Sequence, residues 1–318
     1  MIIWIVIQLI DSIKTGCFSE LFGAIGIAFT SILAYIIGLN SECKTKQFLT
    51  LLELYLSVIC FQTIAESLMG DINFLGDPYY YKHDLITPIG ASNYIATKIV
   101  PLFIFAFSLD ENARRRLFLL ALSFVALILT KSRNGLLCFS IVFILFITFN
   151  NKTSGFKKLF TIFLLLVLFL YFIQKGVIGD LTATYSNSSS TVDGRINLWI
   201  HYIVQSFRYP LLGHGIERVD GYISSHNMVL DIFFRGGIIG SFIFVIGLNY
   251  YLSRMSSNNQ PVATSSKFFL IAEFLISMAE ITFFTVTNDV FFFFIIGLAI
   301  SCCQSSTLGC NNDQSSCS

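Results

Sequence analysis

Apolar runs of about 20 residues recur along this chain of 318 residues, separated by short polar breaks. A helix of that length crosses the hydrocarbon core of a bilayer, which is about 30 Å thick. Hydrophobic residues make up 55% of the chain and charged residues only 12%, with a mean hydropathy of +0.74. Soluble domains carry about twice that share of charge. The chain is therefore predicted to be an all-α integral membrane protein, and the alternation typical of barrel strands is not seen.

The apolar windows predict a polytopic bundle of about ten transmembrane helices. The predicted spans are 1–12, 18–39, 47–68, 93–109, 117–130, 134–149, 159–175, 227–252, 267–286 and 288–303. The first is interpreted as a short span and not as a removable signal peptide, because it lacks a basic start and a small-residue cleavage site. Residues 1–318 are expected to form one membrane domain, with 176–226 as a long periplasmic loop that carries an amphipathic helix.

The distribution of basic residues orients the predicted bundle. By the positive-inside rule, short loops rich in Lys and Arg face the cytoplasm. The loops on that side hold Lys44, Lys46, Arg114, Arg115, Arg116, Lys152, Lys157, Lys158, Arg254 and Lys267. Both termini are then expected in the cytoplasm and the 176–226 loop on the opposite face.

Basic residues also stand on the outer face, against this rule. They are Lys82, Lys131, Arg133, Arg195, Arg208, Arg218 and Arg235. Because ionisable groups near a bilayer are costly, their presence indicates a function, and binding an anion is the simplest one. The net charge of +1 and the lack of a basic block argue against a nucleic acid as that anion.

The stretch "ILTKSRNGLL" places Lys131 and Arg133 where one span ends and the next begins, at the bilayer surface. A guanidinium group matches phosphate oxygens bidentately, so Arg133 is a candidate ligand for an anionic head group. The alternative is an interfacial anchor whose charged end snorkels to water.

A second candidate lies within the predicted outer loop. Apolar residues recur at helical spacing in 195–208, which predicts an amphipathic helix on the membrane interface with Arg195 at its start and Arg208 at its end. Helix N-terminal amides together with Arg195 would form a phosphate site. A plain surface helix with incidental arginines is the alternative.

The turn "PLLGHGIERVDG" follows this helix. It contains His214, Glu217 and Arg218 beside Gly213 and Gly215, and glycines there allow tight turns close to a ligand.

The stretch "SSHNMVLDIFFRGGIIG" opens the next span. Asp231 and Arg235 are four residues apart, so they are predicted to pair on a helix face that is directed toward the protein interior. Gly236 and Gly240 would let a neighbouring helix approach. His226 at the membrane edge is a candidate base, because histidine titrates near neutral pH.

These motifs, in the order "LTKSRNGLL", "GRINLWIHYI", "YPLLGHG" and "SHNMVLDIFFRGGIIG", resemble the O-antigen polymerase and O-antigen ligase group of bacterial inner-membrane glycosyltransferases. The segment "TPIGASNYIATKIVP" is similar to the family's segment that opens a span, with Asn93 in the matching place. Where many relatives carry an arginine ahead of it, this chain has Lys82 and His83.

The resemblance implies a membrane enzyme that takes an undecaprenyl-diphosphate-linked oligosaccharide on the periplasmic face of the bacterial inner membrane. It implies neither a cofactor nor an obligatory metal, and it makes a chain-length regulator protein a candidate partner. His226 would be the general base, with Glu217 as the reserve, and Arg195 and Arg133 would bind the diphosphate. The expected substrate-binding residues are Arg218, Lys131, His214, Glu217, Asn93 and Lys82.

The favoured function is an O-antigen repeat-unit polymerase, because the motif "HNMVLDIFFRGGIIG" and the reduced outer loops are similar to those of repeat-unit polymerases. A ligase that transfers the glycan to lipid A-core is the first alternative, because it needs the same donor site. A transporter or flippase for the same lipid is the second. Charged residues inside several spans and broken helices at mid-membrane would favour the transporter, whereas the charges in this sequence concentrate at one face.

Overall fold

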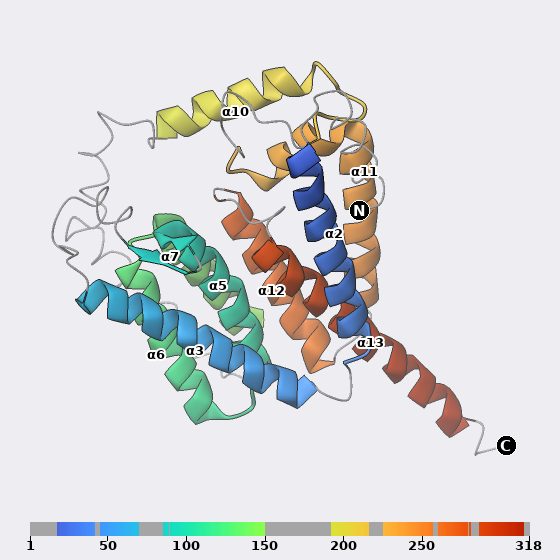
Figure 1. Cartoon of the computed structure of the whole chain (residues 1–318). Coiled ribbons are helices and arrows are strands. Elements are labelled where there is room, and N and C mark those ends of the chain that lie inside the picture. Colours follow the sequence, from blue (N-terminus) through green and yellow to red (C-terminus); the bar gives the residue numbers. More distant parts are fainter. Residues whose placement is uncertain are drawn as a thin grey trace.

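We obtained a computed structural model of the chain (Figure 1), which describes residues 18–41, 45–69, 85–88, 90–149, 192–215, 225–256, 260–278, 280 and 286–314. Within these ranges the fold is helical apart from a hairpin of two short strands, β1 (Ile86–Thr87) and β2 (Gly90–Ala91). The helices are α2 (Phe18–Leu39), α3 (Thr45–Met69), α5 (Ser92–Leu109), α6 (Ala113–Leu129), α7 (Arg133–Phe149), α10 (Val192–Ser206), α11 (Met228–Ser256), α12 (Pro261–Ser277) and α13 (Val286–Gln314).

The predicted helical class is confirmed, and eight of the ten predicted spans correspond to α2, α3, α5, α6, α7, α11, α12 and α13. The other two, 1–12 and 159–175, lie outside the described residues. Three described helices, α3, α5 and α11, are long and apolar enough to cross a membrane. Shorter apolar helices occur at 25–39, 133–149 and 289–304. The count of about ten spans therefore stays a prediction, as does the periplasmic position of 176–226.

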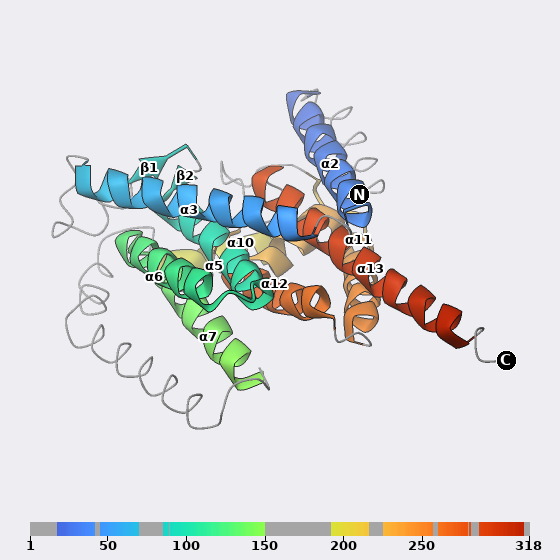
Figure 2. The ribbon, with the colours of Figure 1, turned by 90° about the horizontal axis from the view of Figure 1, so that it is seen from below.

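The helices pack around an aromatic core. α2 lies along α13, and α5 lies along α12 (Figures 1 and 2). Phe103 and Phe105 of α5 are nearly fully buried. The Phe103 ring lies 4.8 Å from Phe139 of α7, and the Phe105 ring lies 6.2 Å from Phe269 of α12. Paired aromatic rings of this kind add to the van der Waals packing that holds membrane helices together.

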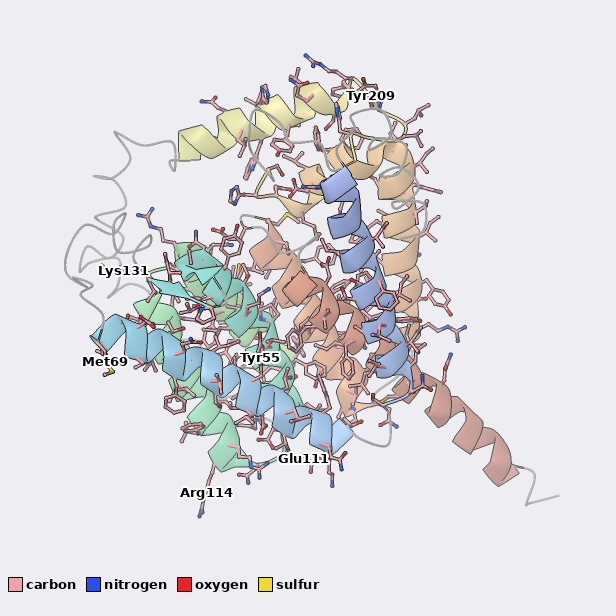
Figure 3. All side chains as sticks on the ribbon, viewed as in Figure 1. Tyr55, Met69, Glu111, Arg114, Lys131 and Tyr209 are labelled. Carbon is pink, nitrogen blue, oxygen red and sulfur yellow. The ribbon has the colours of Figure 1, made fainter. Side chains whose placement is uncertain are left out.

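The two ends of the bundle carry different chemistry. Glu111 and Arg114 lie at one end, whereas Lys131 and Tyr209 lie toward the other (Figure 3). At the first end, Asn112 caps α6 by accepting the N–H groups of Arg114 and Arg115. The guanidinium of Arg116 lies 4.5 Å from the centre of the Phe107 ring, a cation–π contact. The basic residues of "DENARRR" are thus held at the end opposite Lys131, as the predicted orientation requires.

Helix α10 lies across the end of the bundle opposite Arg114 (Figures 1 and 3). It begins three residues before the predicted start and ends at Ser206, so the helix predicted at 195–208 is confirmed with shifted bounds. Its inner face packs on α11 through Tyr202, whose ring centroid lies 4.9 Å from that of Phe234. Ile200, Val204 and Phe207 are exposed, which suits a helix that rests on a lipid interface.

Helix α11 is broken at Gly237, where the backbone has φ 59° and ψ −160°. The turn at 209–215 binds both sides of the break. Its N–H groups at His214 and Gly215 donate to the carbonyls of Phe234 and Arg235, at 2.7 and 3.1 Å. Its carbonyls at Pro210 and Leu211 accept the N–H groups of Ile238 and Ile239, at 2.8 and 3.2 Å. The turn therefore satisfies the polar groups that the break releases, which apolar surroundings require.

Close backbone contact at the break depends on two glycines that face each other. A Cβ on Gly237 would lie 2.5 Å from the Leu211 oxygen, and one on Gly213 would lie 2.5 Å from the Arg235 carbonyl carbon. A Cβ on Gly240 would meet no described atom within 4 Å, and one on Gly236 only Ser241 N at 4.0 Å. The sequence prediction for Gly236 and Gly240 was therefore wrong within the described residues, because the close approach occurs at Gly213 and Gly237.

We expect Gly237→Ala to destabilise the protein by about 2 kcal/mol or more, because the new methyl group overlaps backbone atoms and the left-handed conformation disfavours a side chain. Thermal denaturation of purified protein, followed by size-exclusion chromatography, measures the change. Gly240→Ala is the matched control and should melt like the wild type. Equal melting of all three proteins would contradict the packing described for the break.

Candidate functional site

The motif "TKSRNG" forms the turn between α6 and α7. The hydroxyl of Ser132 accepts the N–H of Gly135 at 3.3 Å and so caps α7. A Cβ on Gly135 would lie 2.6 Å from the Cβ of Ala96, so the start of α7 packs tightly on α5. Arg133, the first residue of α7, is exposed. The local fold thus presents the Arg133 side chain at the end of the bundle and fixes the helix behind it.

The motif "SHN" forms the entry into α11. Asn227 caps the helix, since its side-chain oxygen accepts the N–H groups of Val229 at 3.1 Å and Leu230 at 3.3 Å. Ser225 is fixed on both sides: its N–H donates to the Asp231 carboxylate at 2.8 Å, and its carbonyl accepts the indole N–H of Trp199 at 2.9 Å. His226 lies between these anchored neighbours, and its side chain is 33% exposed.

Two asparagines join these motifs to the end of α12. The side-chain amide of Asn134 donates to the carbonyl of Ile276 at 2.9 Å. That of Asn227 donates to the carbonyl of Met278 at 3.2 Å. Carbonyls at a helix C-terminus have no partner within the helix, so they are available to such donors. Arg133 and His226 each adjoin one of these asparagines, and the end of α12 therefore brings their two motifs together.

The residue beside His226 is Glu280, which follows α12. Its Oε2 lies 3.8 Å from Nδ1 of His226, a distance for an ion pair and too long for a hydrogen bond. Glu280 is buried, with 7% of its surface exposed. Sequence reasoning missed it, because "MAEITFF" carries no motif and only the fold brings it to His226.

Backbone strain coincides with the two motifs. Among the described residues, Lys131 with φ 50° and His226 with φ 56° are the non-glycine residues in the left-handed region. Side chains disfavour this conformation, and it persists where surrounding structure imposes it, most often at functional sites. Sequence reasoning placed both residues in the site for their chemistry alone.

Apart from His214, two of the remaining candidates lie on described helices and three do not. Asn93 is the second residue of α5 and is half-buried. Arg195 lies in the first turn of α10, and its side chain is outside the described part of the structure. The predicted ligands Arg218, Glu217 and Lys82 lie outside the described residues.

His214 is buried and packs inside the protein. Its ring stacks on Phe234 at 4.4 Å, and its Nε2 lies 2.7 Å from the carbonyl of Gln205. These contacts attach the turn to α10 and α11, so its part in substrate binding stays a prediction.

Asp231 and Arg235 are buried, with 5% and 6% of their surfaces exposed, so their predicted inward face is confirmed. Both act electrostatically on the hydroxyl of Tyr202 on α10. Burial, with the Asp231 charge acting in the same direction and Arg235 opposing it, raises the pKa of Tyr202 to about 12. Tyr202 therefore stays protonated and neutral, and these residues support the helix that carries His226.

A second set of buried charges lies inside the bundle, and sequence reasoning missed it too. Lys98 of α5, Glu273 of α12 and Asp289 of α13 are each 4% exposed. Lys98 and Glu273 line the same small cavity, and both carboxylates act electrostatically on Lys98. The interpretation that charges concentrate at one face was thus incomplete, because tertiary packing buries charges from three separate helices.

Within the described residues, no group of three or more His, Cys, Asp or Glu side chains could hold a metal ion. The metal-independent reaction implied by the resemblance stays a prediction.

We expect Asn134→Ala to lower stability by about 1–2 kcal/mol, because it removes a hydrogen bond and leaves the Ile276 carbonyl without that donor. Asn40→Ala is the control: Asn40 donates within its own helix end, to Ile36 at 2.8 Å, at an exposed position. Melting of the purified variants in detergent measures both. A loss as large for Asn40→Ala would show that the bond to α12 has no special weight.

Residues 118–245 match the model of a protein family described as O-antigen ligase. The match runs from α6 into α11, so it contains both asparagines that bind the end of α12, together with Arg133, Arg195 and His226. No curated protein matches the chain. Residues 118–245 are therefore similar to the O-antigen ligase family, which confirms the resemblance of the motifs in this region to the O-antigen polymerase and ligase group.

Proposed function

We propose that this protein is an O-antigen polymerase, which joins undecaprenyl-diphosphate-linked repeat units on the periplasmic face of the bacterial inner membrane. The observation that carries the proposal is the convergence of the two family motifs on the end of α12, through Asn134 and Asn227. It brings together an exposed arginine and a histidine paired with a carboxylate, at the bundle end opposite the basic loop of Arg114.

The proposed reaction is a direct displacement. His226 removes the proton from a hydroxyl of the acceptor sugar, and that oxygen attacks the anomeric carbon of the donor. The bond between this carbon and the phosphate oxygen breaks, so undecaprenyl diphosphate leaves and the configuration is inverted. The proton ends on the imidazole. The charge that develops on the diphosphate must be stabilised more in the transition state than in the ground state for catalysis to result.

Arginines at two helix starts would hold the diphosphate. Arg133 is the first residue of α7, and Arg195 is in the first turn of α10. Helix N-termini favour anions, because their N–H groups and the helix dipole present positive charge there. A guanidinium can bind two phosphate oxygens at once. Lys131, Asn93, Arg218 and Lys82 are proposed as further contacts, and Glu217 as the reserve base.

A ligase is the alternative within the same family, because it would use the same donor and differ in its acceptor, which is lipid A-core. The polymerase is favoured by the similarity of the "HNMVLDIFFRGGIIG" motif to repeat-unit polymerases. A chain-length regulator protein is the proposed partner of the polymerase.

A transporter of the same lipid is the second candidate, and the buried charges of Lys98, Glu273 and Asp289 favour it, since transporters carry ionisable residues within their spans. The positions of Lys98 and Glu273 along their helices favour the enzyme over the transporter. Lys98 is six residues into α5 and Glu273 is four residues from the end of α12. At 1.5 Å per residue they lie about 9 Å and about 6 Å from the helix ends that form the proposed site. Along these helices, both residues lie nearer to the ends that form the proposed site than to the opposite ends.

The test uses a strain that lacks the gene, with the surface polysaccharide separated on a gel. A polymerase is indicated by loss of the ladder with single repeat units still attached to lipid A-core. Loss of all attached units, with lipid-linked polymer accumulating on the periplasmic face of the inner membrane, indicates the ligase. Single lipid-linked units retained on the cytoplasmic face indicate the transporter. An unchanged ladder would overturn all three assignments.

A further inference from the structure

Glu280 is a buried carboxylate outside the region that matches the family model, which ends at residue 245. Its neighbours come from several elements. His226, at the entry to α11, is 3.8 Å away. The Glu280 charge also acts on Tyr94 of α5 and on Cys138 of α7. The carboxylate therefore pairs with His226 and acts electrostatically on residues of α5 and α7, the helices that carry Asn93 and Arg133.

The geometry distinguishes the two nitrogens of His226. Glu280 faces Nδ1, so a neutral ring is favoured with its proton on Nδ1, toward the carboxylate. Nε2 then carries the lone pair that can accept a proton. When it does, the ring becomes positive, and a buried carboxylate stabilises that charge more strongly than a solvated one would.

We propose that Glu280 is the positioning residue of His226, holding the ring with Nε2 available to the acceptor hydroxyl and compensating the charge that forms on it. This inference rests on the proposed function, in which His226 is the base. The 3.8 Å separation is compatible with the role, because such pairs are often long without substrate and tighten in the reacting complex.

The first test follows His226 without any substrate. Full-length protein in lipid nanodiscs is treated with diethyl pyrocarbonate, which modifies neutral imidazole, over pH 5–9, and the peptide carrying His226 is quantified by mass spectrometry. The Glu280 carboxylate lies 3.8 Å from Nδ1, and an opposite charge at this distance favours the protonated ring. In Glu280→Gln that charge is absent, so the midpoint of modification should lie at lower pH than in the wild type.

Among the described residues, Glu280 acts electrostatically on Tyr94 and Cys138, and Asp231 binds Ser225 beside His226. None of these groups is changed by the substitution. Glu280→Asp keeps the charge and should retain a midpoint near that of the wild type. Glu111→Gln is the control, because Glu111 lies at the opposite end of the bundle (Figure 3). A midpoint unchanged in Glu280→Gln would overturn the pairing.

The second test measures glycan transfer by the same proteins with extracted lipid-linked repeat units. We expect Glu280→Gln to lower kcat at least tenfold with little change in KM, and to move the acid limb of the pH profile downward. Glu280→Asp should restore part of the rate. An unchanged kcat would overturn the positioning role. If the wild type transfers no glycan and the modification midpoint still moves, the proposed function fails while the pairing of Glu280 with His226 stands.

Discussion

His226→Ala is expected to lower the rate of glycan transfer by roughly 10²–10⁴-fold, the usual contribution of a positioned general base. The structure gives the reason. The imidazole is one-third exposed at the bundle end, its Nδ1 faces the buried Glu280, and its neighbours Ser225 and Asn227 are fixed by hydrogen bonds. The measurement is the release of undecaprenyl diphosphate by full-length protein in nanodiscs. Affinity for the donor should change little, because in the proposed site the arginines bind it.

His201→Ala is the matched control, since His201 is a half-buried histidine of α10 with no role in the proposed reaction. It should retain most of the wild-type rate. Both variants are compared at equal protein, after melting experiments confirm that each is folded. A folded His226→Ala protein with the rate of the wild type would exclude His226 as the base and leave Glu217 as the candidate.

Arg133→Ala should give the second large effect, a fall of about 10²–10³-fold in kcat, comparable to the loss of one donor from a site that stabilises developing negative charge. Arg133 is exposed at the start of α7, so its removal should leave packing intact. Arg133→Lys should recover part of the rate, because it keeps the charge and loses the bidentate geometry.

The control is Arg114→Ala, which removes an arginine at the opposite end of the bundle (Figure 3). This variant should transfer glycan at the wild-type rate. If Arg133→Ala were as active as Arg114→Ala, Arg133 would be an interfacial anchor, and the diphosphate would have to be held by Arg195 and other residues.

The helices could be predicted from sequence because apolar runs and polar breaks are local properties. The span predicted at 18–39 matches α2 at both ends, and that predicted at 134–149 begins one residue late. The break in α11 was not predicted, since Gly237 lies inside the single span predicted at 227–252. Its conformation is supported by the turn at 209–215, a long-range contact that hydrophobic periodicity does not report.

The candidate site was predictable where its residues fall in recognisable motifs. Arg133 and His226 stand beside polar, turn-forming residues at the ends of spans, which mark them in the sequence. Glu280 and Lys98 are single charges within apolar stretches, and only the packing of α5, α7, α11 and α12 brings them to their neighbours. His214 shows a different limit, because its place in a glycine-rich turn does not reveal that its ring is buried and stacked on Phe234.

The bonds between the 209–215 turn and the broken middle of α11 bear on how chimaeras that contain segments of this protein should be designed. The two segments satisfy each other's backbone and require facing glycines at 213 and 237. A crossover placed between them would combine a turn from one parent with a break from another. Such segments are best exchanged together, and substrate preferences should be transplanted at boundaries that keep this pair from a single parent.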